Sequence, residues 1–276
     1  MIDEAQPSSL RGDRDMRKCV IAAGFIVLVG MFWSIGFGAG ALVDHSPIVI
    51  EGDYQFTVEN GVVSGSGTVD DPYVIEGWRI DAGYNDYGIR IHRTTRYFII
   101  RNVEISGAGK AGISLSYVKN GVITDSHLTG NWIGISLNFS AHNKISSCTI
   151  ESNGDGIHFY FSHDNQIIQC TVTKNDTAIW LDGSNGNDLI GNTISANYMG
   201  VYLDLGAEGN LIYSNAFIDN VHNAHSVAVN DWDYNGQGNY WSDYRGIDAD
   251  ENGIGDAPYV IRSKGDQDNY PLLNIP

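Results

Sequence analysis

Positively charged residues are scarce in this 276-residue chain, which holds 16 lysines and arginines against 33 aspartates and glutamates. The formal net charge is −17 at pH 7, and because residues 1–43 contain four acids and four bases, the excess lies entirely in residues 44–276. A surface of that sign repels phosphate backbones, which excludes nucleic-acid binding. Three cysteines without the spacing of a metal motif exclude a disulfide-rich scaffold. The chain is rich instead in glycine (33) and asparagine (24), and its 42% of apolar residues suffice for a folded core.

One long uncharged run lies near the N-terminus, from Cys19 to Val43, and is 25 residues long. It follows four basic residues: Arg11, Arg14, Arg17 and Lys18. About 20 apolar residues span a bilayer, and the basic flank stays cytoplasmic. We therefore expect a cytoplasmic tail at 1–15, a signal peptide or membrane anchor at 16–43, and an extracytoplasmic remainder. The length favours a retained anchor through residues 19–43, whereas Ala39-Gly40-Ala41 matches a cleavage site, so both alternatives stand.

The rest of the chain carries an internal repeat of 22 residues. Its clearest copies are Gly112–Leu115, Gly134–Leu137, Gly156–Phe159, Ala178–Leu181 and Gly200–Leu203, and Gly88–Ile91 precedes them with a step of 24. Three further columns keep the step of 22: Ile123, Ile145, Ile167, Leu189 and Leu211; Leu128, Ile150, Val172 and Ile194; and Asn131, Asn153, Asn175 and Asn197. Columns that stay in register over several copies predict a solenoid.

Each repeat unit consists of short segments with the alternation of a strand. Ile113 and Leu115 alternate with Ser114 and Ser116, the period of two that buries one set of side chains. A leucine-rich repeat has a similar length, but its convex side needs helices or leucine-rich turns, and here the second half of each unit alternates as a strand. We therefore predict an all-β parallel β-helix at 44–230 with a C-terminal cap that carries an acidic loop at 231–276. Stacked coils place the asparagine column as a ladder of amides at a turn.

Three stretches of the chain resemble the NosD-like β-helix family, part of a larger group of carbohydrate-binding and sugar-hydrolase repeats. They are the repeat itself, the segment Gly65–Trp78, and the segment from Gly238 to Leu272, which is similar to a closing segment found in archaeal surface proteins. The resemblance covers about residues 47–276 and implies a right-handed coil. It implies no single function, because this group includes enzymes, binding modules and scaffolds. The family's namesake assists copper assembly, but copper(I) prefers cysteine and methionine, and Met199 is the one methionine after residue 43.

The outward positions of the first strand form two neighbouring columns in the predicted stack. In related β-helices that act on polysaccharides, this face is the usual groove. We expect four side chains to bind a glycan there: His158, Tyr160, Trp180 and Tyr202. Asp182 and Asp204 are one coil apart, about 4.8 Å, near the spacing of a retaining glycosidase pair, and they are the catalytic candidates. Against catalysis, the motifs of β-helix pectinases and alginate epimerases are missing, and a solvated acidic face is the plain alternative.

Two further groups have a structural explanation that we favour. The chain has a single basic cluster, formed by Arg90, His92, Arg93, Arg96 and Arg101. We expect these side chains to pair with neighbouring acids, with binding of an acidic glycan as the alternative. Cys148 and Cys170 share one inward column. They are expected to serve as apolar core thiols, although a step of about 4.8 Å also permits a disulfide.

The acidic loop of the cap has the spacing of a calcium site. From Asp248 to Asp256, oxygen ligands fall at positions 1, 3, 5, 7 and 9 with glycine at position 6: Asp248, Asp250, Asn252, the carbonyl of Ile254, and Asp256. Tyr259 replaces the glutamate that ends an EF-hand loop, so Asp266 or Asp268 would complete the shell. We expect a structural calcium ion, with a bare acidic turn as the alternative.

Together these features predict an exported cell-surface β-helix that acts as a structural or glycan-binding module, without catalysis. A polysaccharide lyase or hydrolase that uses Asp182 and Asp204 is one alternative. An accessory for metal (copper) assembly is the other.

Overall fold

The computed structural model describes residues 41–261 and 265–276. The predicted signal peptide or anchor at 16–43 lies almost wholly outside these residues. Within the described part, no helix is long and apolar enough to cross a membrane. Residues 42–276 form one compact unit.

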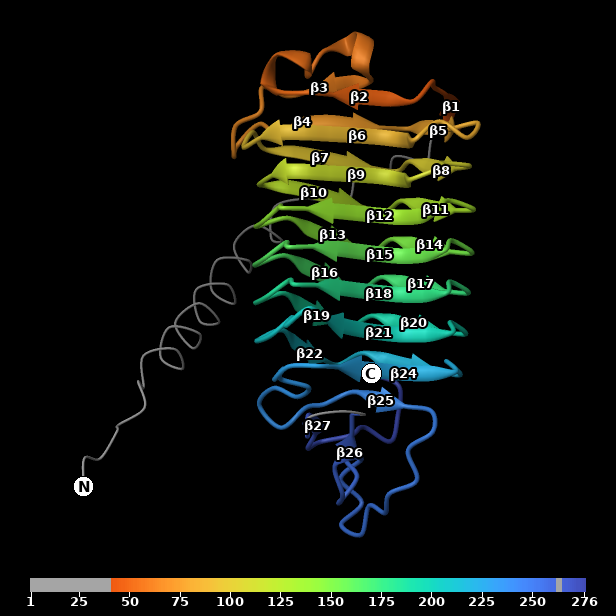
Figure 1. Cartoon of the computed structure of the whole chain (residues 1–276), viewed down its shortest axis with the longest axis vertical. Coiled ribbons are helices and arrows are strands. Elements are labelled where there is room, and N and C mark those ends of the chain that lie inside the picture. Colours follow the sequence, from red (N-terminus) through yellow and green to blue (C-terminus); the bar gives the residue numbers. More distant parts are fainter. Residues whose placement is uncertain (1–40, 262–264) are drawn as a thin grey trace, which may run out of the picture. The chain divides into compact units, whose positions relative to one another are not determined.

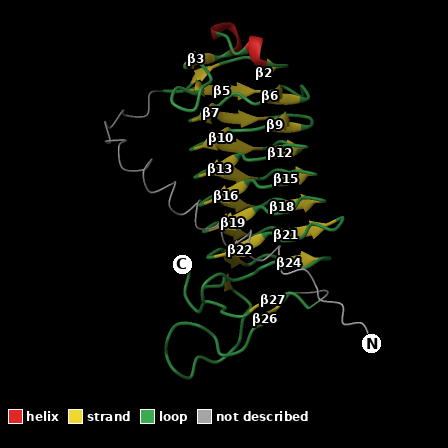
Figure 2. Cartoon of the chain, turned by 90° about the vertical axis from the view of Figure 1, so that its left-hand side faces the viewer, coloured by secondary structure: helices red, strands yellow, loops and turns green. Residues whose placement is uncertain are grey.

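This unit is built from three sheets whose strands stack as successive rungs (Figures 1 and 2). Sheet 1 contains β2 (Ile48–Ile50), β6 (Tyr87–Thr94), β9 (Ala111–Val118), β12 (Ile133–Asn138), β15 (Asp155–Tyr160), β18 (Thr177–Asp182), β21 (Met199–Asp204) and β24 (His222–Ser226). Sheet 2 contains β3 (Val62–Ser64), β4 (Tyr73–Glu76), β7 (Phe98–Arg101), β10 (Gly121–Thr124), β13 (Lys144–Ser146), β16 (Gln166–Ile168), β19 (Asp188–Ile190) and β22 (Leu211–Tyr213). Sheet 3 contains β1 (Val43–Asp44), β5 (Trp78–Asp81), β8 (Glu104–Ser106), β11 (His127–Thr129), β14 (Thr149–Glu151), β17 (Thr171–Thr173), β20 (Thr193–Ser195), β23 (Ala216–Ile218) and β25 (Tyr240–Trp241).

The chain visits sheets 1, 2 and 3 in turn and then returns to sheet 1 one rung further along, as in β6, β7, β8 and β9. Strands within each sheet are parallel, except that β3 pairs with β4 in the antiparallel sense. The fold is therefore the predicted all-β, right-handed parallel β-helix. Two short 3-10 helices, η1 (Asp53–Gln55) and η2 (Val58–Asn60), lie between β2 and β3.

The strand register confirms the repeat that the sequence predicts. Ile113, Ile135, Ile157, Ile179 and Val201 are successive partners in sheet 1, and all five are 0% exposed. One predicted column is wrong at its end, because Leu189 pairs with Ile212 instead of Leu211. The coil before β22 holds one extra residue, so the step from Asn187 to Asn210 is 23.

Gly134 shows why the second residue of most strands of sheet 1 has no side chain. A Cβ atom at Gly134 would lie 2.6 Å from the carbonyl oxygen of Gly156 on the next coil and 2.7 Å from Cγ2 of Ile150. Both distances are shorter than van der Waals contact, so glycine permits the close approach of sheet 3 to the start of the strand.

The predicted asparagine column is a hydrogen-bonded ladder at the corner between sheets 3 and 1. Oδ1 of Asn153 accepts the backbone N–H of Asn131 at 3.0 Å, and its Nδ2 donates to the carbonyls of Leu128 at 3.1 Å and Glu151 at 3.0 Å. Nδ2 also reaches Oδ1 of Asn175 at 3.2 Å, which continues the chain of amides. Buried backbone groups at the corner are thereby satisfied without a strand partner.

Two further asparagine ladders were not predicted. One precedes sheet 2 and runs through Asn143, Asn165, Asn187, Asn210 and Asn230. The other precedes sheet 3, where Asn192, Asn215 and Asn239 continue the column of Cys148 and Cys170. With Asn220, which continues the first ladder, the three ladders account for more than half of the chain's 24 asparagines. Cys148 and Cys170 are free and 1% exposed, as expected of core thiols, and the hydrogen bond with the Cys170 thiol, followed by burial, raises the pKa of Cys148.

The C-terminal hairpin of β26 (Tyr259–Val260) and β27 (Gln267–Asp268) ends these two ladders with carboxylates. Asp266 accepts the N–H of Asn230 at 3.2 Å, and Asp268 accepts the N–H of Asn239 at 2.7 Å and the indole N–H of Trp241 at 2.8 Å. Burial nevertheless raises the pKa of Asp268 to about 6. The expectation that either residue completes a calcium shell is wrong, because both carboxylates lie in the interior and face N–H and O–H donors of the last coil.

The register makes Ile150→Asp the sharpest test of the inward assignment. Ile150 is fully buried between Leu128 and Val172, so an unpaired carboxylate there should lower the free energy of unfolding by about 4 kcal/mol or more. Thr149→Asp makes an exposed aspartate one residue away and should change it by less than about 0.5 kcal/mol. Urea unfolding followed by circular dichroism measures both, and equal losses would refute the register.

Candidate functional site

The outer face of sheet 1 carries two neighbouring columns of side chains from the second half of its strands, one residue per coil in each. The first column is Arg90, Ser114, Ser136, His158, Trp180, Tyr202 and His225, and the second is His92, Ser116, Asn138, Tyr160, Asp182 and Asp204. The structure thus brings together all four predicted glycan-binding residues and both catalytic candidates. Their strands are adjacent, from β15 to β21, because the 22-residue step keeps equivalent positions level.

Aromatic rings stack along the first column. The ring of His158 lies 4.5 Å from that of Trp180 with an interplanar angle of 14°, and Trp180 meets Tyr202 edge-on at 5.8 Å. Tyr202 stacks on His225 at 5.0 Å, which extends the column to β24. Offset and edge-on contacts of this kind hold the rings in fixed orientations.

This face also gathers polar atoms that have no hydrogen-bond partner. Over residues 41–261 and 265–276, four buried side-chain polar atoms lack one: Nδ1 of His92, Nε2 of His158, Nε1 of Trp180 and Oδ1 of Asp182. All four lie on the outer face of sheet 1. Unsatisfied buried polar atoms cost about 1–3 kcal/mol each, so four on one face point to a ligand that satisfies them.

Burial changes the protonation of these groups. Desolvation lowers the pKa of His158 to about 4, so its imidazole is neutral at pH 7. Burial, and secondarily the charge of Asp204, raises the pKa of Asp182, which is only 8% exposed. Asp204 accepts the N–H of Leu205 at 2.7 Å. The two carboxylates therefore sit in different environments although their backbones are paired.

A ridge of aromatic side chains, Tyr117, Phe139 and Phe161, lies beside the second column at the ends of the sheet 1 strands. Tyr117 stacks on Phe139 at 5.2 Å and Phe139 on Phe161 at 5.8 Å, with interplanar angles of 11° and 4°. The three side chains are 52%, 46% and 38% exposed. Tyr160 touches both phenylalanine rings edge-on, at 5.5 and 4.7 Å, which joins the ridge to the outer face.

The ridge occupies left-handed backbone positions, with φ of 55° at Tyr117, 48° at Phe139 and 44° at Phe161. Bulky residues rarely adopt this conformation, so placing aromatic residues there costs conformational free energy. Gly183 follows in the next coil with φ 56°, and a Cβ there would lie 2.7 Å from the Phe161 ring. Sequence reasoning missed the ridge, although its step of 22 was visible.

The basic cluster lies on β6, on β7 and in the turn between them, and three of its four arginines are neutralised by acids, as expected. Arg90 pairs with Glu51 at 2.5 Å, Arg96 with Asp53 at 3.1 Å, and Arg101 with Glu76. Arg93 forms no ion pair with any residue that the structure describes. It lines an open pocket of about 260 Å³ together with Asp53, Thr94, Thr95 and Tyr117.

Comparison with known proteins assigns the family. The model of the family described as "Periplasmic copper-binding protein (NosD)" matches residues 45–246, most of the chain. The chain belongs to the NosD family. The predicted resemblance is thereby confirmed.

Two curated relatives in the NosD family carry the description "Probable ABC transporter binding protein NosD". The protein from Pseudomonas aeruginosa is 32% identical, over 26% of this chain and 26% of the relative. The protein from Stutzerimonas stutzeri is 31% identical, over 26% of this chain and 25% of the relative. The chain thus spans about a quarter of the length of these relatives.

Solved structures with the same fold include two epimerases. The A-module of mannuronan C-5 epimerase AlgE6 from Azotobacter vinelandii has a TM-score of 0.53 at 18% identity and covers 57% of this chain and 50% of that one. A double mutant of the periplasmic alginate epimerase AlgG has a TM-score of 0.51 at 19% identity, and the match covers 56% of this chain and 38% of that one. At this identity the likeness concerns the fold alone.

The NosD family description names copper, which the residues of the described part do not fit. Copper prefers thiolate, thioether and imidazole ligands. Cys148 and Cys170 are enclosed in the core, and Met199 faces a single histidine, its strand partner His222. Among the described residues, the one group of three His, Cys, Asp or Glu side chains with converging ligand atoms consists of aspartates.

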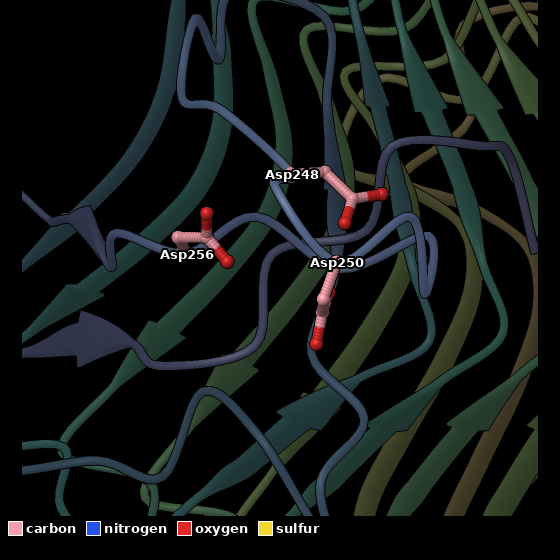
Figure 3. A group of neighbouring side chains, drawn as sticks. All are labelled: Asp248, Asp250 and Asp256. Carbon is pink, nitrogen blue, oxygen red and sulfur yellow. The ribbon is translucent and has the colours of Figure 1, made fainter.

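That group is the acidic loop between β25 and β26 (Figure 3). Oxygen atoms of Asp248, Asp250 and Asp256 lie within 4.8 Å of one another. Both oxygens of Asp248 accept backbone N–H groups, from Asn252 at 3.1 Å and Gly253 at 2.9 Å, and these bonds lower its pKa. Oδ1 of Asn252 accepts the N–H of Ile254 at 2.8 Å. Three of the five predicted calcium ligands therefore converge, while Asn252 and Ile254 bond to each other, and calcium at this loop stays a prediction.

Calcium should raise the melting temperature if it binds this loop. The three carboxylates repel one another when ionised, and a weak extracellular site with a dissociation constant of ~10⁻⁴–10⁻³ M would relieve that repulsion. Chelator should lower the melting temperature of the parent, and added calcium should restore it, but neither should affect Asp250→Asn/Asp256→Asn. Asp70→Asn/Asp71→Asn, with exposed acids in another loop, should behave as the parent. If the melting temperature of the parent responds to neither chelator nor calcium, the loop binds no calcium and is a bare acidic turn.

The pKa of His158 predicts a pH dependence with a definite sign. Its folded-state value of about 4 lies below the ordinary 6.5, so the unfolded chain binds more protons between these values. The free energy of unfolding should therefore fall as pH drops from about 6.5 to about 4. His158→Asn removes this contribution, and the stability difference between parent and variant, measured by urea unfolding across that range, should change accordingly. If the free energies of unfolding of parent and variant change in parallel with pH, the imidazole of His158 is exposed to solvent and the prediction is wrong.

Proposed function

We propose that this chain is an extracytoplasmic glycan-binding protein of the NosD family, and that the outer face of sheet 1 is its binding surface. The observation that carries the proposal is the gathering of four unpartnered buried polar atoms on one face that also carries stacked aromatic rings. Sugars present hydroxyl groups that both donate and accept hydrogen bonds, and apolar C–H faces that pack on aromatic rings. A glycan therefore matches both features of this surface.

The location of the surface also supports a polymeric ligand. The aromatic column and the ridge run across successive coils, from β9 to β24, with a rise of about 4.8 Å per coil. A flat repetitive surface of this kind can bind an extended chain at several equivalent points. Extracytoplasmic placement is supported by the family's description as periplasmic and by the uncharged N-terminal run, which would export the chain or hold it at the cell surface.

The alternatives have weaker support. A copper-assembly role is favoured by the family description, but the described residues offer no cluster of soft ligands. A lyase or hydrolase would use Asp182 and Asp204, whose neighbouring strands suit a carboxylate pair. A purely structural role would leave the unpartnered atoms without explanation.

Glycan retention should depend on the aromatic column. Trp180→Ala and Tyr202→Ala should each weaken retention in affinity gels by about tenfold, because each removes a stacking surface. Trp132→Ala is the matched control, since Trp132 is 69% exposed at the turn between β11 and β12, away from the column. Melting temperatures of all three variants establish that they fold.

Two outcomes would contradict the proposal. Equal loss of retention in Trp132→Ala and Trp180→Ala would place the binding surface elsewhere. Cleavage of a retained glycan by the parent, abolished in Asp204→Asn, would make the chain a lyase or hydrolase.

A further inference from the structure

The charges on the outer face of sheet 1 distinguish between classes of glycan. From β9 to β24, the two columns contain no lysine or arginine, and their only carboxylates are Asp182 and Asp204. His158 in the first column is neutral at pH 7 because burial lowers its pKa. The two columns are therefore negative at β18 and β21 and uncharged from β9 to β15, and the half-buried Asp155 at the start of β15 adds a further carboxylate to sheet 1.

The cations that could offset these carboxylates lie at the far end. Arg90 is already bound to Glu51. Arg93 lies four coils from Asp182 by strand register, roughly 19 Å, and shares its pocket with Asp53. At that separation an exposed charge is largely screened by salt. Neither Arg90 nor Arg93 therefore lies where it could hold an anionic ligand against Asp182.

We infer that the outer face of sheet 1 takes an uncharged polysaccharide and rejects polyuronates. This inference rests on the proposed glycan-binding function and names its ligand class. Polyuronates such as alginate carry a carboxylate on every sugar, so a chain along the face would bring like charges against Asp182 and Asp204. A neutral chain brings hydroxyl groups instead, which donate to Oδ1 of Asp182 and accept from the indole N–H of Trp180.

The aromatic ridge supports the same ligand class. Tyr117, Phe139 and Phe161 add exposed apolar surface beside the polar columns, without any charge. Two solved structures that share this fold are named for mannuronan and alginate, both of which are polyuronates. An uncharged ligand on the same architecture is compatible with that likeness, because side chains on the face decide the ligand and the coil does not.

The test compares neutral and anionic polysaccharides on the full chain in mild detergent. Affinity gels containing galactomannan or a neutral β-glucan should retard the parent at concentrations at least about tenfold lower than gels containing alginate or polygalacturonate. Asp182→Asn/Asp204→Asn should narrow this difference, because it removes the repulsion. Asp70→Asn/Asp71→Asn changes the net charge equally at exposed loop positions and should leave the difference unchanged.

Each other outcome has a distinct meaning. Stronger retention by alginate or polygalacturonate than by both neutral polymers would overturn the inference and leave glycan binding intact. Retention by neither class would overturn the proposed function itself. An equal effect of the two double variants would show that net charge, and not the two carboxylates on the face, controls selection.

Discussion

The structure depends on the side-chain amides that connect one coil to the next. Oδ1 of each ladder asparagine accepts the backbone N–H of the coil before it, and its Nδ2 donates to carbonyls of its own and earlier coils. A coil with one residue too many must absorb it in a loop, as the coil before β22 does, because the amides hold the corners level. Fixed corners fix the strands between them, so equivalent side chains stack directly above one another in the core and on the surface.

This stacking explains why polar atoms stay unpartnered on the outer face of sheet 1. A side chain there meets mainly the equivalent positions of the coils above and below, which lie at nearly the same height. His158 lies between Ser136 and Trp180, and Trp180 between His158 and Tyr202. Ring stacking satisfies the faces of these side chains and leaves their polar edges without acceptors or donors. The regularity that stabilises the coil thus creates a surface that a ligand with many hydroxyl groups would complete.

The repeat of 22 predicted the first-strand register, the core and the Asn131 ladder, because those positions recur without insertion. The ladder through Asn192 escaped prediction because its column begins as Cys148 and Cys170, whereas the ladder through Asn143, Asn165 and Asn187 keeps the step of 22 and was visible in the sequence. The ridge escaped because Phe139 and Phe161 occupy backbone positions that propensity assigns to glycine or asparagine. Asp266 and Asp268 reach their partners across 36 and 29 residues, a contact no periodicity reveals. The burial of His158 and Asp182 could not be predicted, because it depends on side chains of neighbouring coils whose positions only the structure shows.

The indole resonances of the tryptophans test the account most directly, since each indole N–H gives its own signal in a proton–nitrogen spectrum. The N–H of Trp180 has no acceptor, whereas those of Trp78, Trp232 and Trp241 donate to Gly61, Asp266 and Asp268. On titration with a neutral oligosaccharide, the Trp180 signal, assigned with Trp180→Phe, should move downfield while the other three stay in place. A Trp180 signal that stays fixed at saturating oligosaccharide would contradict the account.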